Sequence, residues 1–112
     1  MLGHLNRIEE EAITKLKTLL SQKLGNSLKN VLLYGSKARG DYDNDSDIDI
    51  LVVADGVDYE MKDTIRDVVL DIQLEYSVPI SAHIRSLDYF NTQQNNRLNL
   101  FIHNVEREGI RV

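Results

Sequence analysis

The 112-residue sequence contains no cysteine and only one proline. Without cysteine, the chain has neither a disulfide framework nor a thiolate nucleophile or zinc knuckle. It also has no apolar run near the roughly 20 residues that a membrane-spanning helix requires. Its N-terminus lacks the basic and apolar regions of a secretory signal. These absences favour a cytoplasmic protein.

Positive charge is also scarce. Thirteen Lys and Arg residues stand against 18 Asp and Glu residues, which gives a formal net charge of -5. This balance argues against a free-standing nucleic-acid-binding protein, which needs a basic surface for phosphates. It leaves a triphosphate ligand open, because a metal ion neutralises phosphate locally. The length, with 42% apolar and 28% charged residues, predicts one globular domain over residues 1–112.

The hydrophobic pattern predicts alternating helices and strands. Apolar residues at steps of three and four predict an amphipathic first helix that ends at Gly25. A second long helix is expected to begin at an N-cap, Asp58, and a last helix to end at Gly109. Short strands are predicted over residues 31–34, 47–54 and 79–85.

This order of elements predicts an α+β fold, a small mixed sheet with helices packed on one face. In the strand over residues 79–85, Ser81, His83 and Arg85 alternate with apolar residues, so these three polar side chains share one face. A short helix is expected to open at Ser86, and residues 110–112 are expected to be extended.

The segment between the first two strands carries the chemistry. Gly35 and Ser36 follow the first strand directly, and a helical turn starting there would direct free backbone N–H groups at a ligand above the strand. Glycine lets an anion approach the backbone closely, and the Ser36 hydroxyl adds a hydrogen bond. Lys37 and Arg39 could add positive charge at the rim. Together they form a candidate phosphate-binding turn.

Two carboxylates follow on the second strand. Asp47 and Asp49 are two residues apart, so both side chains project from one face, roughly 6–7 Å apart along the chain. Carboxylate oxygens suit Mg²⁺, which usually takes substrate phosphates and water as its further ligands. Paired aspartates can hold the metal ions that stabilise the attacking and leaving oxygens in phosphoryl-type transfer. The sequence therefore joins a candidate phosphate turn to a candidate metal site.

Other interpretations of this acidic, glycine-containing segment fit less well. An EF-hand loop starting at Asp41 needs glycine where Ser46 stands and glutamate where Val52 stands. A Walker loop needs Lys-[ST] after the second glycine, and Asp41-Tyr42 stands there. The remaining alternative is a solvated turn and strand, which does not explain why two aspartates occupy strand positions where aspartate is disfavoured.

The segment resembles the signature of the DNA polymerase beta-type nucleotidyltransferase superfamily. That signature is Gly-Ser, ten residues, then Asp-x-Asp, and it is matched by Gly35-Ser36 and Asp47-x-Asp49. The fuller form found in the minimal nucleotidyltransferase (MNT) group is matched as well, by Ala38-Arg39-Gly40 and Ser46-Asp47.

The resemblance implies a function and residue roles. Gly35 and Ser36 would hold a nucleoside triphosphate, with ATP expected, and Asp47 and Asp49 would be the catalytic residues that bind Mg²⁺. Small MNT proteins are commonly encoded beside a HEPN-domain protein, and several are antitoxins that add AMP to a tyrosine of a HEPN ribonuclease toxin. The expected reaction is transfer of a nucleoside monophosphate, AMP from ATP, to a hydroxyl group that such a partner presents.

The sequence departs from the family pattern at one point. The family's third carboxylate is expected on the strand over residues 79–85, which contains no Asp or Glu. Ser81 and His83 face the position where it should stand, and His83 is a candidate general base because its ordinary pKa lies near neutrality. A polar residue on an open sheet face is the simpler interpretation of His83.

Two further alternatives follow from this gap and from the surrounding charges. Lys37 and Arg39 could pair with Asp41 and Asp43 instead of a phosphate. Without its third carboxylate, the chain could be an antitoxin that masks its toxin by direct contact, with nucleotide binding vestigial or regulatory. A small-molecule nucleotidyltransferase acting with a second subunit is a further, less favoured hypothesis.

Overall fold

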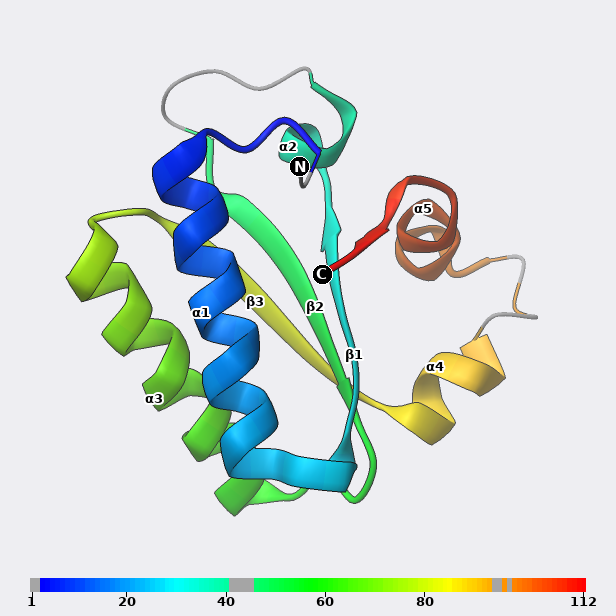
Figure 1. Ribbon diagram of the computed structural model, residues 1–112. Helices are drawn as coiled ribbons and strands as arrows, with labels where there is room; N and C mark the ends of the chain where they lie inside the picture. The colour runs from blue at the N-terminus through cyan, green and yellow to red at the C-terminus, as the bar shows by residue number, and fades with distance from the viewer. Residues whose placement is uncertain (1–2, 41–45, 94–95, 97) are drawn as a thin grey trace.

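The computed structural model describes residues 3–40, 46–93, 96 and 98–112 (Figure 1). The chain alternates between helices and strands, as the sequence predicts. In chain order the elements are α1 (Arg7–Leu24), η1 (Gly25–Ser27), β1 (Leu28–Tyr34), α2 (Ser36–Arg39), β2 (Ile48–Ala54), α3 (Tyr59–Tyr76), β3 (Ile80–Ser86), α4 (Leu87–Gln93), α5 (Leu100–Glu108) and β4 (Ile110–Arg111).

The described strands form a mixed four-stranded sheet in the order β3-β2-β1-β4. β1 is antiparallel to both β2 and β4, whereas β2 and β3 are parallel and are joined by α3 as a crossover helix. β2 is therefore central, with Asp49 between Tyr34 of β1 and Ser81 of β3. The predicted mixed sheet is confirmed.

The helix boundaries follow from local sequence. Asn6 caps the N-terminus of α1 in a capping box with Glu9, and Gly25 ends that helix with a φ of 56°. The carboxylate of Asp58 accepts a hydrogen bond from the Met61 N–H at the start of α3, at 2.8 Å. The Ser86 hydroxyl accepts one from the Tyr89 N–H in the first turn of α4. The caps predicted at Gly25 and Asp58 and the helix start predicted at Ser86 are confirmed.

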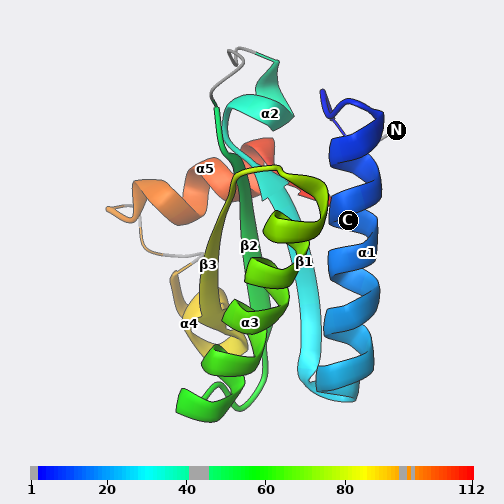
Figure 2. The same cartoon turned by 90° about the vertical axis from the view of Figure 1, so that its left-hand side faces the viewer.

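α1 and α3 lie side by side on one face of the sheet (Figures 1 and 2). They bury the apolar side chains of β1 and β2 that point toward them, including Leu33, Ile48 and Ile50, in the main core. Most of their outward-facing side chains are polar, although Ile8 of α1 and Leu70 and Leu74 of α3 are exposed. No described helix is long and apolar enough to cross a membrane.

The prediction that helices pack on one face holds for α1 and α3 but needs a correction. α4 and α5 lie on the opposite side of the sheet (Figure 2), where Phe90 and Ile102 pack with Leu51 and Val53 in a second, smaller core. The sequence does not predict this placement, because the short, interrupted pattern of these helices does not tell which side of the sheet they cover. The second core covers Leu51 and Val53 completely, while Asp49 on the same face of β2 is only half-buried.

Candidate functional site

The turn between β1 and α2 lies directly against a carboxylate of β2. Gly35 has a φ of +76°, which non-glycine residues rarely adopt, and a Cβ atom placed on it would collide with Oδ2 of Asp49. The carbonyl of Gly35 accepts hydrogen bonds from the N–H groups of Ala38 and Arg39, both at 3.1 Å, and so closes the helical turn of α2. The Gly-Ser turn and the Asp-x-Asp strand therefore meet at one place.

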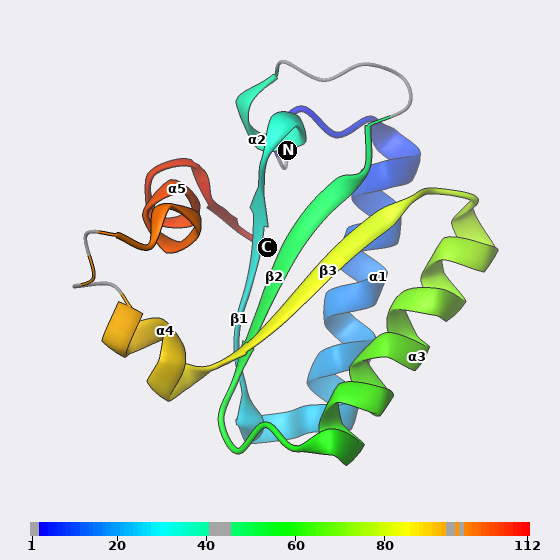
Figure 3. The same ribbon diagram turned by 180° about the vertical axis from the view of Figure 1, so that it is seen from behind.

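Asp49 is the second residue of β2, at the end of the sheet where α2 lies (Figure 3). The strand predicted over residues 47–54 begins one residue later, at Ile48, so Asp47 lies just outside it. Asp49 is half-buried in the strand, and Asp47 is exposed just before it. Burial raises the pKa of Asp49, and the negative charge of Asp47 raises it further, while His83 and Arg39 act in the opposite direction. Two carboxylates that repel each other in this way favour a shared cation.

A polar and aromatic surface surrounds Asp49. The Tyr34 and His83 rings lie 6.1 Å apart between centroids, and both come from strands that neighbour β2. Burial, and then the charge of Asp49, raise the pKa of Tyr34 to about 12, against a smaller opposing effect of Arg85. Tyr34 is not among the site residues expected from the sequence, although it ends β1 and directly precedes Gly35.

The structure brings no third carboxylate to this place in the part of the chain that it describes. Ser81 lies beside Asp49 in the register of β2 and β3, and His83 lies two residues further on. Glu75 forms an ion pair with Lys15 on the other side of the sheet, at 2.7 Å, and Asp88 is exposed in α4. Among the described residues, no group of three or more acidic or histidine side chains could hold a metal ion. A metal would need phosphate and water ligands besides Asp47 and Asp49.

The two basic residues of the turn, Lys37 and Arg39, lie in different surroundings. Arg39 is exposed, and its charge acts on Asp49. Lys37 is 4% exposed, and its ammonium lies 3.0 Å from Oε2 of Glu9 in α1. Lys37 was expected at the rim of the phosphate turn, but it lies in a buried ion pair. No local pattern could have found this pair, because its members are 28 positions apart.

Some of the expected site residues cannot be placed. The backbone of Ser36 begins α2, but its side chain lies outside the described part of the structure. Asp41 and Asp43, the alternative partners of Lys37 and Arg39, lie outside it as well.

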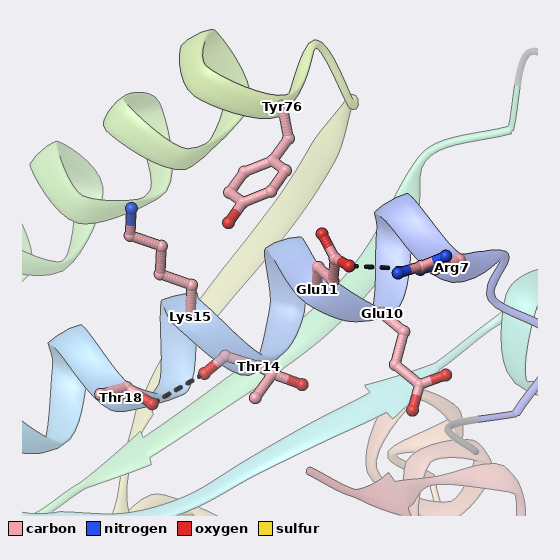
Figure 4. A pocket seen from close by; sticks show the side chains of 7 residues that line it. All are labelled: Arg7, Glu10, Glu11, Thr14, Lys15, Thr18 and Tyr76. Carbon is pink, nitrogen blue, oxygen red and sulfur yellow. Dashed lines mark hydrogen bonds and ion pairs between the residues drawn. The ribbon is translucent and has the colours of Figure 1, made fainter.

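A hollow of about 810 Å³ lies elsewhere, along α1 and the end of α3 (Figure 4). Its lining includes Arg7 and Glu11, which pair with each other at 3.5 Å, and Lys15, which pairs with Glu75. It is on the other side of the sheet from Asp49 and contains none of the expected site residues. Both of its basic side chains are paired with carboxylates, so the hollow does not compete with Asp49 as the site of phosphate chemistry.

Comparison with known proteins identifies the family. Residues 13–110 match the family model for the nucleotidyltransferase domain. The chain belongs to this family. It is also 40% identical over 102 residues to the predicted protein adenylyltransferase MJ0604 of Methanocaldococcus jannaschii, an alignment that covers 90% of this chain and 94% of the relative. The chain is therefore a nucleotidyltransferase, as its motif indicates.

Solved structures support the fold. A predicted minimal nucleotidyltransferase superposes with a TM-score of 0.56 at 22% identity, over 92% of this chain and 94% of that one. A toxin–antitoxin structure with AMP-PNP gives a TM-score of 0.59 at 19% identity, over 91% of this chain and 70% of that one. At these identities the likeness concerns the fold alone. The expected nucleotidyltransferase family is confirmed by the family model and by the similarity to MJ0604.

Proposed function

We propose that residues 1–112 act as one nucleotidyltransferase domain that transfers AMP from ATP to a hydroxyl group of a partner protein, with Mg²⁺ as its metal. The observation that carries this proposal is the contact between the Gly35 turn and the Asp49 carboxylate. A phosphate-binding turn and a metal-binding carboxylate act on one triphosphate only when they adjoin. The choice of AMP and of a protein acceptor is supported by MJ0604, which is named as a predicted protein adenylyltransferase.

Each site residue has a proposed role. The backbone of Gly35 and Ser36 holds the triphosphate, and Arg39 adds positive charge at its exposed edge. Asp47 and Asp49 are the catalytic carboxylates and bind Mg²⁺. The metal fits these residues because carboxylate oxygens are its preferred protein ligands. In addition, the negative charges of Asp47 and Asp49 repel each other, and a bound cation would relieve this repulsion. When bound, Mg²⁺ would neutralise the phosphates and the charge that develops in transfer.

The reaction asks the protein mainly for positioning. The acceptor oxygen attacks the α-phosphorus, the bond from that phosphorus to the bridging oxygen breaks, and pyrophosphate leaves. Because β3 carries Ser81 instead of a carboxylate beside Asp49, we propose that the acceptor's proton passes to water or to a group of the partner. The chain thus depends on its partner to present, and to help activate, the acceptor.

The proposed partner is a HEPN-type toxin, with this chain as its antitoxin. The support is the fold shared with one chain of a toxin–antitoxin structure with AMP-PNP. A second function, neutralisation by binding alone, is favoured by a specific observation, the absence of a carboxylate from β3. The two functions differ in whether the partner becomes covalently labelled.

One experiment separates them. The chain is incubated with α-³²P-labelled ATP, Mg²⁺ and the candidate partner, beside Asp47→Ala, Asp49→Ala and, as a matched control on the exposed face of α3, Asp67→Ala. We expect label on the partner with the wild type and Asp67→Ala, and a loss of at least 100-fold in both site variants. A tight complex without label, equal for all four proteins, would establish binding alone and refute the enzyme.

A further inference from the structure

One ion pair stands out because it is buried. Among the described residues, the buried charged side chains are Glu9, 7% exposed, and Lys37, 4% exposed, and they pair with each other at 3.0 Å. Burying two charges is costly, and apolar residues of similar size often give equal stability. A buried ion pair is therefore better explained by the geometry that it fixes than by the stability that it adds.

The carboxylate of Glu9 is held rigidly. Its Oε1 accepts a hydrogen bond from the Asn6 N–H at 2.9 Å, which completes the capping box at the start of α1. Its Oε2 is thereby directed at the ammonium group of Lys37. Glu9 thus links the N-terminus of α1, which is anchored in the main core, to α2.

α2 needs such an anchor. It has four residues, and a helix of that length is not stable by itself in water. The N–H of His4 donates to the carbonyl of Lys37 at 2.9 Å, and the His4 ring packs so closely on Gly40 that a Cβ there would lie 2.8 Å from Nε2. The segment before α1 therefore holds α2 by its backbone, and the Glu9–Lys37 ion pair holds it by a side chain.

We propose that Glu9 and Lys37 are positioning residues for nucleotide binding. Their ion pair sets the orientation of α2, and with it the distance between the Gly35 turn and Asp49. Lys37 acts on the triphosphate only through the placement of α2, which its ion pair with Glu9 anchors to α1, and its ammonium does not touch phosphate. This inference rests on the proposed function, because it assigns the ion pair to the same nucleotide site.

The test compares single and double variants of the pair. Lys37→Met leaves a buried carboxylate without its cation. Glu9→Gln keeps an oxygen for the Asn6 N–H but leaves the ammonium without its anion, and the double variant leaves neither charge. The dissociation constant (Kd) for ATP is measured on the isolated chain with Mg²⁺ by calorimetry, and KM and kcat are measured in the labelling assay.

A positioning role predicts a specific pattern. Each single variant should raise Kd and KM for ATP at least tenfold, by factors within threefold of each other, with a smaller change in kcat. The double variant should bind no more weakly than either single variant. Direct phosphate binding by Lys37 predicts instead that Glu9→Gln binds within twofold of the wild type, or that the two effects multiply in the double variant. Either result would overturn the proposal.

Controls separate positioning from loss of structure and from failure of the proposed function. Val69→Ala, at a position of α3 that is buried in the main core, should lower the melting temperature without changing Kd, and Lys37→Arg should keep the binding that Lys37→Met loses. If Lys37→Met does not fold by circular dichroism, Glu9→Asp replaces it, and its longer ion pair should raise KM in the same way. If Asp49→Ala binds ATP and labels the partner like the wild type, the proposed function fails, whatever the ion-pair variants do.

Discussion

Replacing Gly35 by alanine tests the contact on which the site depends. Gly35 has a φ of +76°, and its missing Cβ leaves the space that the Asp49 carboxylate occupies. The left-handed backbone alone costs an alanine about 1–2 kcal/mol. The new methyl group also forces the Asp49 carboxylate away from the turn. We therefore expect Gly35→Ala to lose both stability and nucleotide binding.

The chain offers a matched control for the backbone effect. Gly56 has a φ of +68°, and a Cβ there would meet nothing within 4 Å. Gly56→Ala should therefore show the backbone strain alone, about 1–2 kcal/mol, which lowers the melting temperature of a domain of this size by roughly 4–8 °C. Its affinity for ATP and Mg²⁺ should stay within twofold of the wild type.

The difference between the two variants isolates the collision with Asp49. Thermal melting followed by circular dichroism gives their stabilities, and calorimetric titration with ATP and Mg²⁺ gives their Kd values. The Kd of Gly35→Ala for ATP should be at least tenfold higher than that of Gly56→Ala, and its melting temperature should be no higher. If Gly35→Ala binds ATP as tightly as Gly56→Ala, the turn and Asp49 do not act on one ligand, and the reasoning is refuted.

Three further predictions concern the charges of the site and its support. Burial, and then the charge of Asp47, raise the pKa of Asp49, so the fold penalises its ionised form; this penalty is full above the raised pKa and vanishes below the ordinary carboxyl pKa of about 4. Asp49→Asn should therefore raise the melting temperature of the metal-free chain at pH 7, with a gain that disappears near pH 3; an equal gain at both pH values would contradict the cause given. The Tyr34 phenol should titrate near pH 12 by ultraviolet absorbance, and at a lower pH in Asp49→Asn. A pKa of Tyr34 that is the same in both proteins would show that the charge of Asp49 does not act on the phenol. In chemical denaturation, Lys37→Met should lower the free energy of unfolding by about 3–5 kcal/mol, because it leaves the buried Glu9 carboxylate unpaired. Lys15→Met breaks the exposed pair with Glu75 and should cause no measurable loss of stability. Equal losses in the two variants would mean that burial does not determine how much each ion pair contributes to stability.

Local patterns predicted much of this fold. The first helix ends at Gly25 because glycine accepts positive φ there, and Asp58 caps α3 through its own carboxylate. The alternation of Ser81 and His83 with apolar residues correctly predicts a strand with one polar face. Each of these features depends on residues within one turn of helix or one stretch of strand, which is why sequence alone suffices.

The arrangement of the site depends on distant parts of the chain, and there the sequence was less informative. The motif spacing predicts that Gly35 and Asp49 cooperate, but only the antiparallel register of β1 and β2 puts Asp49 beside Tyr34. Lys37 follows the Gly-Ser pair in sequence and was therefore expected at the phosphate turn. The short helix α2 directs its side chain toward Glu9, a contact that depends on how α1 packs on the sheet. The roles of Asp47 and Asp49 as metal ligands stay predictions.

The most direct test of the account locates the nucleotide-bound metal on the chain. Paramagnetic Mn²⁺ replaces Mg²⁺ in the presence of ATP, and backbone amide signals are followed by NMR for broadening. We predict that the amides of Gly35, Asp49 and Ser81 broaden most strongly, while those of Thr14 and Thr18 at the hollow along α1 stay sharp. Broadening centred on that hollow, with sharp signals from Gly35 and Asp49, would contradict the central claim that the turn and the carboxylates form one nucleotide site.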